Sequence, residues 1–118
     1  MIDLAERNKF RALHILAACD SIIASTKGLN QDDFFANAEK VNSAIYQLII
    51  IGEAVGHIDY DILDKYSYPW YKVKAFRNYA AHEYFNIEIW TVWEIVSHHV
   101  IELRKVILKM IEKEFSKR

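Results

Sequence analysis

The feature that most constrains the fold of this chain is its shortage of residues that break helices. Only three glycines and one proline occur in 118 residues. A β-sandwich or barrel needs many tight turns, and those turns depend on glycine and proline. Hydrophobic residues make up 53% of the chain and charged residues 26%, a composition typical of a folded domain. The sequence therefore predicts one all-α domain over residues 1–118.

Apolar residues recur at helical spacing in four long segments, each of which we expect to be a helix. The segments cover residues 3–26, 30–58, 70–82 and 87–118. A short extra helix fits residues 59–66. Four helices joined by short connections make an up-and-down four-helix bundle. So many aromatic residues also leave apolar surface that needs a partner, so we expect a homodimer.

Three local signals support this assignment. Asn30 is a suitable N-cap for the second helix, and Pro69 suits the first turn of the third. The first helix has an apolar stripe that is expected to face the core. Its members are Phe10, Leu13, Ala17 and Ile23.

Charge and cysteine content limit the partners and the compartment. The net charge is -1, so attraction to nucleic acid has to come from a local basic patch. Cys19, the single cysteine, lies in an apolar run without a neighbouring base, so we expect it to pack rather than to react. It cannot form an internal disulfide, which favours a reducing cytoplasm. We see no secretory signal and no apolar run long enough to span a bilayer, so no membrane association is expected.

The densest polar chemistry lies in residues 77–84, RNYAAHEY. On a straight helix, Arg77 and His82 point in directions that differ by roughly 140°. They can converge if the helix frays near His82, or in a groove shared with a second copy of the chain. The same residues could also serve only as a helix C-cap, a core histidine and a packed ring.

An arginine and a histidine that do meet in a cleft suit transfer at an RNA phosphodiester. The guanidinium fork matches a phosphate, and an imidazole moves protons near neutral pH. The 2′-hydroxyl of RNA supplies the nucleophile, and the arginine stabilises the charge that develops on the phosphate. DNA lacks that hydroxyl and would be inert by this route.

This stretch resembles the signature R-x4-6-H-x-Y of the HEPN-domain ribonucleases. Arg77, His82 and Tyr84 match the signature, and Asn78 is the polar residue that usually follows the arginine. LIIIGEAVGHI resembles the IGEA helix of the HepT-like branch, and YPWYKVKAFRNYAAHEYFNIEIWTVWEIV resembles its PW…RN…HEY…W block. The similarity covers most of residues 33–103. Many relatives carry glycine two residues before the arginine, where this chain has Ala75.

The resemblance implies a dimeric helical bundle in which two motifs face one cleft. It implies a metal-independent endoribonuclease that needs no cofactor, with Arg77 and His82 as the catalytic pair and Asn78 in support. It further implies a toxin encoded beside an MntA-like minimal nucleotidyltransferase antitoxin. That antitoxin would transfer AMP onto Tyr84, which adds bulk and negative charge in the RNA groove.

Two other classes of function stay open at this point. The chain could be a non-catalytic HEPN module that binds nucleotide or RNA, or serves as the partner subunit of a nucleotidyltransferase. It could also be a plain helical dimer without chemistry. Lys72 and Lys74 alternate with aromatic residues, and they form either a small RNA-binding surface or solvated positions beside core rings.

Glutamate and histidine residues elsewhere in the chain raise the question of a metal. Glu53 with His57, and Glu94 with His98, have i,i+4 spacing, which favours simple side-chain pairs over metal ligands. We therefore expect no metal site. Glu53 belongs to the IGEA segment and could brace the motif from the second helix. One of the adjacent residues His98 and His99 could approach the cleft, and the sequence does not decide which.

Overall fold

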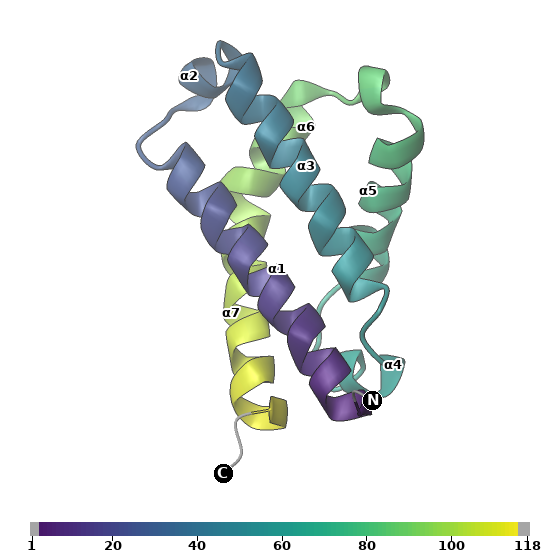
Figure 1. Cartoon of the computed structure of the whole chain (residues 1–118). Coiled ribbons are helices and arrows are strands. Elements are labelled where there is room, and N and C mark those ends of the chain that lie inside the picture. Colours follow the sequence, from purple (N-terminus) through teal and green to yellow (C-terminus); the bar gives the residue numbers. More distant parts are fainter. Residues whose placement is uncertain (1–2, 116–118) are drawn as a thin grey trace.

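The computed structural model describes residues 3–115, and every regular element in this part of the chain is a helix. Four long helical segments run up, down, up and down in chain order (Figure 1). They are α1 (Leu4–Thr26), α3 (Ala38–Val55), α5 (Trp70–His82) and a last segment that contains α6 (Ile89–Glu94) and α7 (Val100–Met110). The connections hold the short helices α2 (Gln31–Phe35) and α4 (Tyr60–Leu63) and the 3₁₀ turn η1 (Tyr84–Asn86). The predicted all-α, up-and-down architecture is confirmed.

The single helix predicted over residues 30–58 is wrong, because the chain breaks between α2 and α3. Asn30 does cap the helix that follows it, in a capping box with Asp33, but that helix lasts only five residues. The side chain of Asn37 then accepts a hydrogen bond from the backbone nitrogen of Lys40 at 3.1 Å and starts α3. An asparagine whose side chain can bond to the backbone favours a cap over a helix interior.

The face of α1 that packs into the core also differs from the prediction. Phe10 and Leu13 of the predicted stripe are exposed, at 58% and 41%. The buried positions of α1 are Asn8, Ala12, Ile15, Ala18, Cys19 and Ile22. Ile15 and Ile22 supply the large apolar side chains of this face, and the alanines between them let neighbouring helices come close. Cys19 is free and fully buried, and burial raises the pKa of its thiol to about 12.

The last helical segment contains two turns with π geometry, η2 (Ile95–His99) and η3 (Ile111–Phe115). Its predicted apolar spacing largely holds, because Val96, Val100 and Leu103 are buried. The sequence predicts that this segment reaches the C-terminus, and residues 116–118 lie outside the described part of the chain. A π turn widens the helix by one residue and often occurs at functional sites. No sequence signal marked these two turns.

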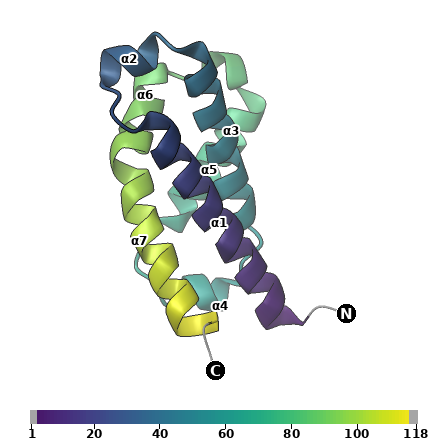
Figure 2. The same ribbon diagram turned by 60° about the vertical axis from the view of Figure 1, so that its left-hand side comes forward.

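The four long segments pack in the order α5, α3, α1, α7, and the bundle is not tightly closed between its first and last members. α1 packs against α3 and α7, and α3 packs against α5. Figure 2 shows α1 and α7 next to each other, with α5 behind α3. The side between α5 and α7 is therefore the least tightly packed. None of the helices within residues 3–115 is both long and apolar enough to cross a membrane.

Candidate active site

The motif arginine lies where α5 crosses α3. A Cβ atom added to Gly52 of α3 would lie 2.2 Å from Cβ of Arg77 and 3.1 Å from the carbonyl oxygen of Val73. Because carbon atoms do not approach to 2.2 Å without a bond, only glycine permits this contact. The glycine of the IGEA segment therefore sets how the stem of Arg77 lies across α3. Ala75 is exposed and is not the position of close approach.

Glu53, next to that glycine, holds the guanidinium of Arg77. Its Oε1 lies 2.6 Å from Nη2 of Arg77, and its Oε2 lies 3.2 Å from Nε2 of His57. Nη1 of Arg77 donates to Oδ1 of Asn78 at 3.1 Å. The hydrogen bond with His57, followed by the charge of Arg77, lowers the pKa of Glu53 below its ordinary 4.5. The carboxylate is therefore ionised at neutral pH, and the four side chains form one network.

This network leaves part of the guanidinium accessible. The side chain of Arg77 is 37% exposed, and that of Glu53 is 45% exposed. Nε of Arg77 is buried and finds no hydrogen-bond partner among residues 3–115. A phosphate that reaches Arg77 has to share the guanidinium with Glu53, which occupies one of its edges.

His82 stands apart from Arg77 within one chain. It is the last residue of α5 and is exposed. The helix is regular through both residues, so their directions differ by about 140°. It ends only after His82, where Glu83 takes φ -126° and ψ 39°. Fraying of the helix before His82 therefore does not bring Arg77 and His82 together. Of the two arrangements that the sequence allowed, only a groove shared with a second copy of the chain is left.

Tyr84 follows directly and is tied to α3. Its Oη donates to Oδ1 of Asn42 at 2.9 Å, and the residue is 38% exposed. Asn42 and Glu53 lie eleven positions apart, close to three full turns, so they share one face of α3. The same face of α3 thus contacts the motif at two points, once at Tyr84 and once at Arg77.

Comparison with known proteins identifies the family. The family model described as "Ribonuclease HepT-like" matches residues 15–110. This chain belongs to the HepT-like ribonuclease family. The resemblance predicted from the motifs is thereby confirmed.

Curated relatives of this HepT-like chain carry ribonuclease names. "Putative RNase TTE0752" of Caldanaerobacter subterraneus subsp. tengcongensis is 31% identical over 102 residues, covering 86% of this chain and 91% of that protein. "Putative RNase MJ0125" of Methanocaldococcus jannaschii is 34% identical over 99 residues, covering 83% of this chain and 85% of that protein. No solved structure gives a significant match.

The structure places the two lysines predicted to bind RNA on different sides of α5. Lys72 and Lys74 are both exposed, but two positions on a helix differ in direction by about 200°. Lys72 lies at the rim of a cavity between α5 and the last helical segment. The stem of Lys74 lies near Gly56 of α3, on the side of Arg77.

Only the first of the two predicted Glu–His pairs forms, because no hydrogen bond or salt bridge within residues 3–115 joins Glu94 to His98. His57 pairs with Glu53, and His99 Nδ1 lies 3.1 Å from Oε1 of Glu102. His98 is exposed, and of the two adjacent histidines His99 lines the cavity. In the part of the chain that the structure describes, no group of three or more His, Cys, Asp or Glu side chains could hold a metal ion.

Two contacts of this site were not predicted from the sequence. Nothing in the sequence indicated the hydrogen bond from Tyr84 to Asn42, because a single asparagine on a helix surface can have many partners. The close approach at Gly52 was indicated by the glycine itself. A glycine inside an apolar helical segment costs about 1 kcal/mol of helix propensity, which indicates a packing reason for its presence.

Proposed function

We propose that this HepT-like protein is a metal-independent endoribonuclease that cleaves RNA in a cleft formed by two copies of the chain. The observation that carries the proposal is the anchored but accessible guanidinium of Arg77, which Gly52 and Glu53 hold at the surface of α5. The exposed His82 on the same helix supplies an imidazole. Family membership supports the same reaction class.

In the proposed reaction the 2′-oxygen of a ribose attacks the adjacent phosphorus. A bond forms between O2′ and phosphorus, and the bond from phosphorus to O5′ breaks. The imidazole of His82 takes the proton of the 2′-hydroxyl, and a protonated His82 from the second copy delivers a proton to O5′. Arg77 stabilises the negative charge that develops on the phosphate, and Asn78 orients Arg77 through their hydrogen bond. The products carry a 2′,3′-cyclic phosphate and a 5′-hydroxyl.

The proposal extends to regulation as a toxin with an MntA-like nucleotidyltransferase as antitoxin. Oη of Tyr84 would attack the α-phosphorus of ATP, so that AMP is joined to the tyrosine and pyrophosphate leaves. The partial exposure of Tyr84 supports access to its hydroxyl. The modified oxygen can no longer donate to Asn42, and the added phosphate brings negative charge to the groove that RNA needs.

A second candidate is a non-catalytic HEPN module that binds nucleotide or RNA, or serves as the partner subunit of a nucleotidyltransferase. The ion pair between Arg77 and Glu53 favours this candidate, because it already satisfies one edge of the guanidinium. Such a module would still bind RNA but would leave every phosphodiester intact.

A cleavage assay separates the two candidates. Purified protein is incubated with end-labelled RNA in excess EDTA, and the fragment ends are analysed by mass spectrometry. An endoribonuclease of the proposed kind yields 2′,3′-cyclic phosphate ends, and an RNA with 2′-deoxyribose at the cleavage position stays intact. A protein that retains RNA in a binding assay but produces no fragments is the binding module.

A further inference from the structure

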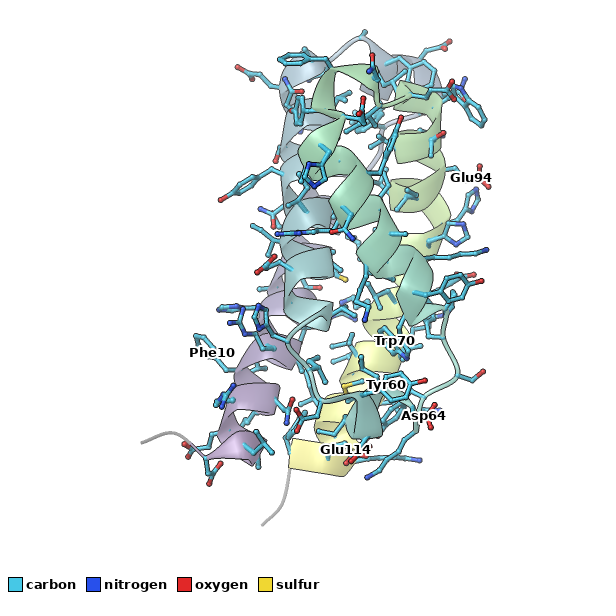
Figure 3. All side chains as sticks on the ribbon, turned by 90° about the vertical axis from the view of Figure 1, so that its right-hand side faces the viewer. Phe10, Tyr60, Asp64, Trp70, Glu94 and Glu114 are labelled. Carbon is cyan, nitrogen blue, oxygen red and sulfur yellow. The ribbon has the colours of Figure 1, made fainter. Side chains whose placement is uncertain are left out.

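A cavity of about 380 Å³ lies between α3, α5 and the last helical segment, away from the Arg77–Glu53 pair. Its volume falls within the range of small-ligand sites. Figure 3 views the molecule from the side of α5, where Trp70 marks the start of α5 and Glu94 marks the end of α6. The cavity walls are mostly apolar: Leu48, Ile51, Pro69, Val73, Phe76, Ile95, Val100 and Leu103.

The π turn η2 gives one wall of the cavity a specific shape. Ile95 and His99, the first and last residues of that turn, both line it. Tyr68 also lines the cavity and is tied to this turn, because its Oη donates to the carbonyl oxygen of His99 at 3.2 Å. Burial raises the pKa of Tyr68 to about 12, so the hydroxyl stays protonated. Turns of this kind often occur at functional sites.

The polar groups of the cavity are few and lie among aromatic rings. Lys72 is exposed and forms no salt bridge with another residue in the range 3–115. Glu102 is a hydrogen-bond acceptor, held by His99. The rings of Tyr68 and Phe76 offer flat apolar surface. A matching ligand is planar and largely apolar, donates a hydrogen bond from one edge and carries a negative charge.

We propose that this cavity binds a nucleobase, with the phosphate of the same nucleotide on Lys72. Bases stack on aromatic side chains in sites that bind single strands, and a lysine beside them neutralises the backbone. Phe76 lines the cavity and is followed directly by Arg77, so a strand that crosses α5 would reach both places. If the base belongs to an RNA substrate, the inference rests on the proposed function. Binding of a free nucleotide does not depend on it.

Methyl NMR tests the proposal without any cleavage. The probes are AMP, GMP, CMP, UMP, a short oligonucleotide with 2′-deoxy linkages, and ribose 5-phosphate as the ligand without a base. Reporter methyl groups are those of Ile51, Val73, Ile95 and Leu103, with buried Ile15 of α1 as a remote reference. We expect saturable shifts at the reporters with at least one nucleotide, and none with ribose 5-phosphate.

Variants separate this site from general charge attraction. Lys72→Glu should weaken nucleotide binding at least tenfold, whereas Lys105→Glu, an exposed lysine of α7 outside the cavity, should not. If the reporter methyl groups shift with the oligonucleotide, the bound base belongs to a strand. If they shift only with mononucleotides, the ligand is a free nucleotide. Both results support the cavity as a base site, even if RNA is never cleaved.

Three results would overturn the proposal. One is the absence of reporter shifts with every nucleotide and with the oligonucleotide. Another is equal affinity of the wild type and Lys72→Glu. The third is a set of reporter shifts that depends on protein concentration without any nucleotide, because a second copy of the chain then fills the cavity.

Discussion

Gly52 of α3 lies directly against the side chain of Arg77 of α5, and a Cβ on Gly52 would come within 2.2 Å of Cβ of Arg77. The stem of Arg77 is therefore fixed by a backbone of the neighbouring helix, and its head by the carboxylate of Glu53. Arginine has a long and mobile side chain, so such a double hold reduces the freedom it has to lose when it binds a phosphate.

Gly52→Ala should weaken the fold and displace Arg77. Overpacking of this kind costs about 1–3 kcal/mol of unfolding free energy, against a gain of about 1 kcal/mol in helix propensity. We expect a net loss, measured by urea denaturation, together with reduced RNA cleavage. Gly56→Ala is the matched control, because its Cβ would meet only ordinary contacts from 3.4 Å upward and its φ of -65° suits alanine. Gly52→Ala with wild-type stability and activity would show that the helices can separate freely.

The acid side of the stability profile should contain a contribution from Glu53. The pKa of Glu53 is lowered in the folded chain, so its stabilising effect is present above its ordinary 4.5 and disappears as the pH falls below that value. The difference in unfolding free energy between the wild type and Glu53→Gln should therefore shrink between about pH 5.5 and pH 3. Glu94→Gln, at an exposed position of α6, should show no such trend. A constant difference for Glu53→Gln would argue against the pair with Arg77 and His57 in solution.

Tyr84 should be the residue that receives AMP when an MntA-like nucleotidyltransferase is encoded beside this gene. After co-expression, intact-mass and peptide mass spectrometry should show added AMP on the wild type and on Tyr79→Phe, but not on Tyr84→Phe. Tyr79 is a fair control because its Oη also bonds nearby, to the carbonyl oxygen of Asn86 at 2.9 Å. Complete loss of RNA cleavage on co-expression with an unmodified Tyr84 would point to simple steric inhibition.

The thiol of Cys19 should be inert in the folded protein. Burial raises its pKa to about 12 and keeps reagents away from the sulfur, so very little reactive thiolate is accessible at pH 8. Alkylation by iodoacetamide should be very slow in buffer and complete within minutes in urea. Equally fast labelling in both conditions would show that α1 opens readily at this position.

The sequence predicted the architecture well because apolar spacing and the shortage of glycine and proline act over long segments. It failed where a single side chain decides the outcome. Asn37 begins a new helix inside the segment predicted as one, although an asparagine within a long apolar pattern looks ordinary. On α1, both faces carry apolar residues, and the choice between them depends on how closely α3 and α7 approach.

The candidate site was predictable to the extent that its residues lie in one short motif. The density of polar residues drew attention to Arg77 and His82, and the family resemblance supplied their expected roles, the role of Tyr84 and the segment that contains Glu53. Contacts across helices were harder. The partner of Tyr84 is Asn42, and the shape of the cavity depends on a π turn that no residue pattern announces.

The most direct test of catalysis by His82 is the rate of RNA cleavage by His82→Ala in the presence of EDTA. The comparison is with the wild type and with His14→Ala, an exposed histidine of α1 that belongs to no proposed site. Circular dichroism and denaturation should show that all three proteins fold alike. We expect His82→Ala to cut about 10²–10⁴-fold more slowly, as for the loss of a general acid or base, with His14→Ala at the wild-type rate. Cleavage by His82→Ala at the wild-type rate would show that His82 is not the general acid or base.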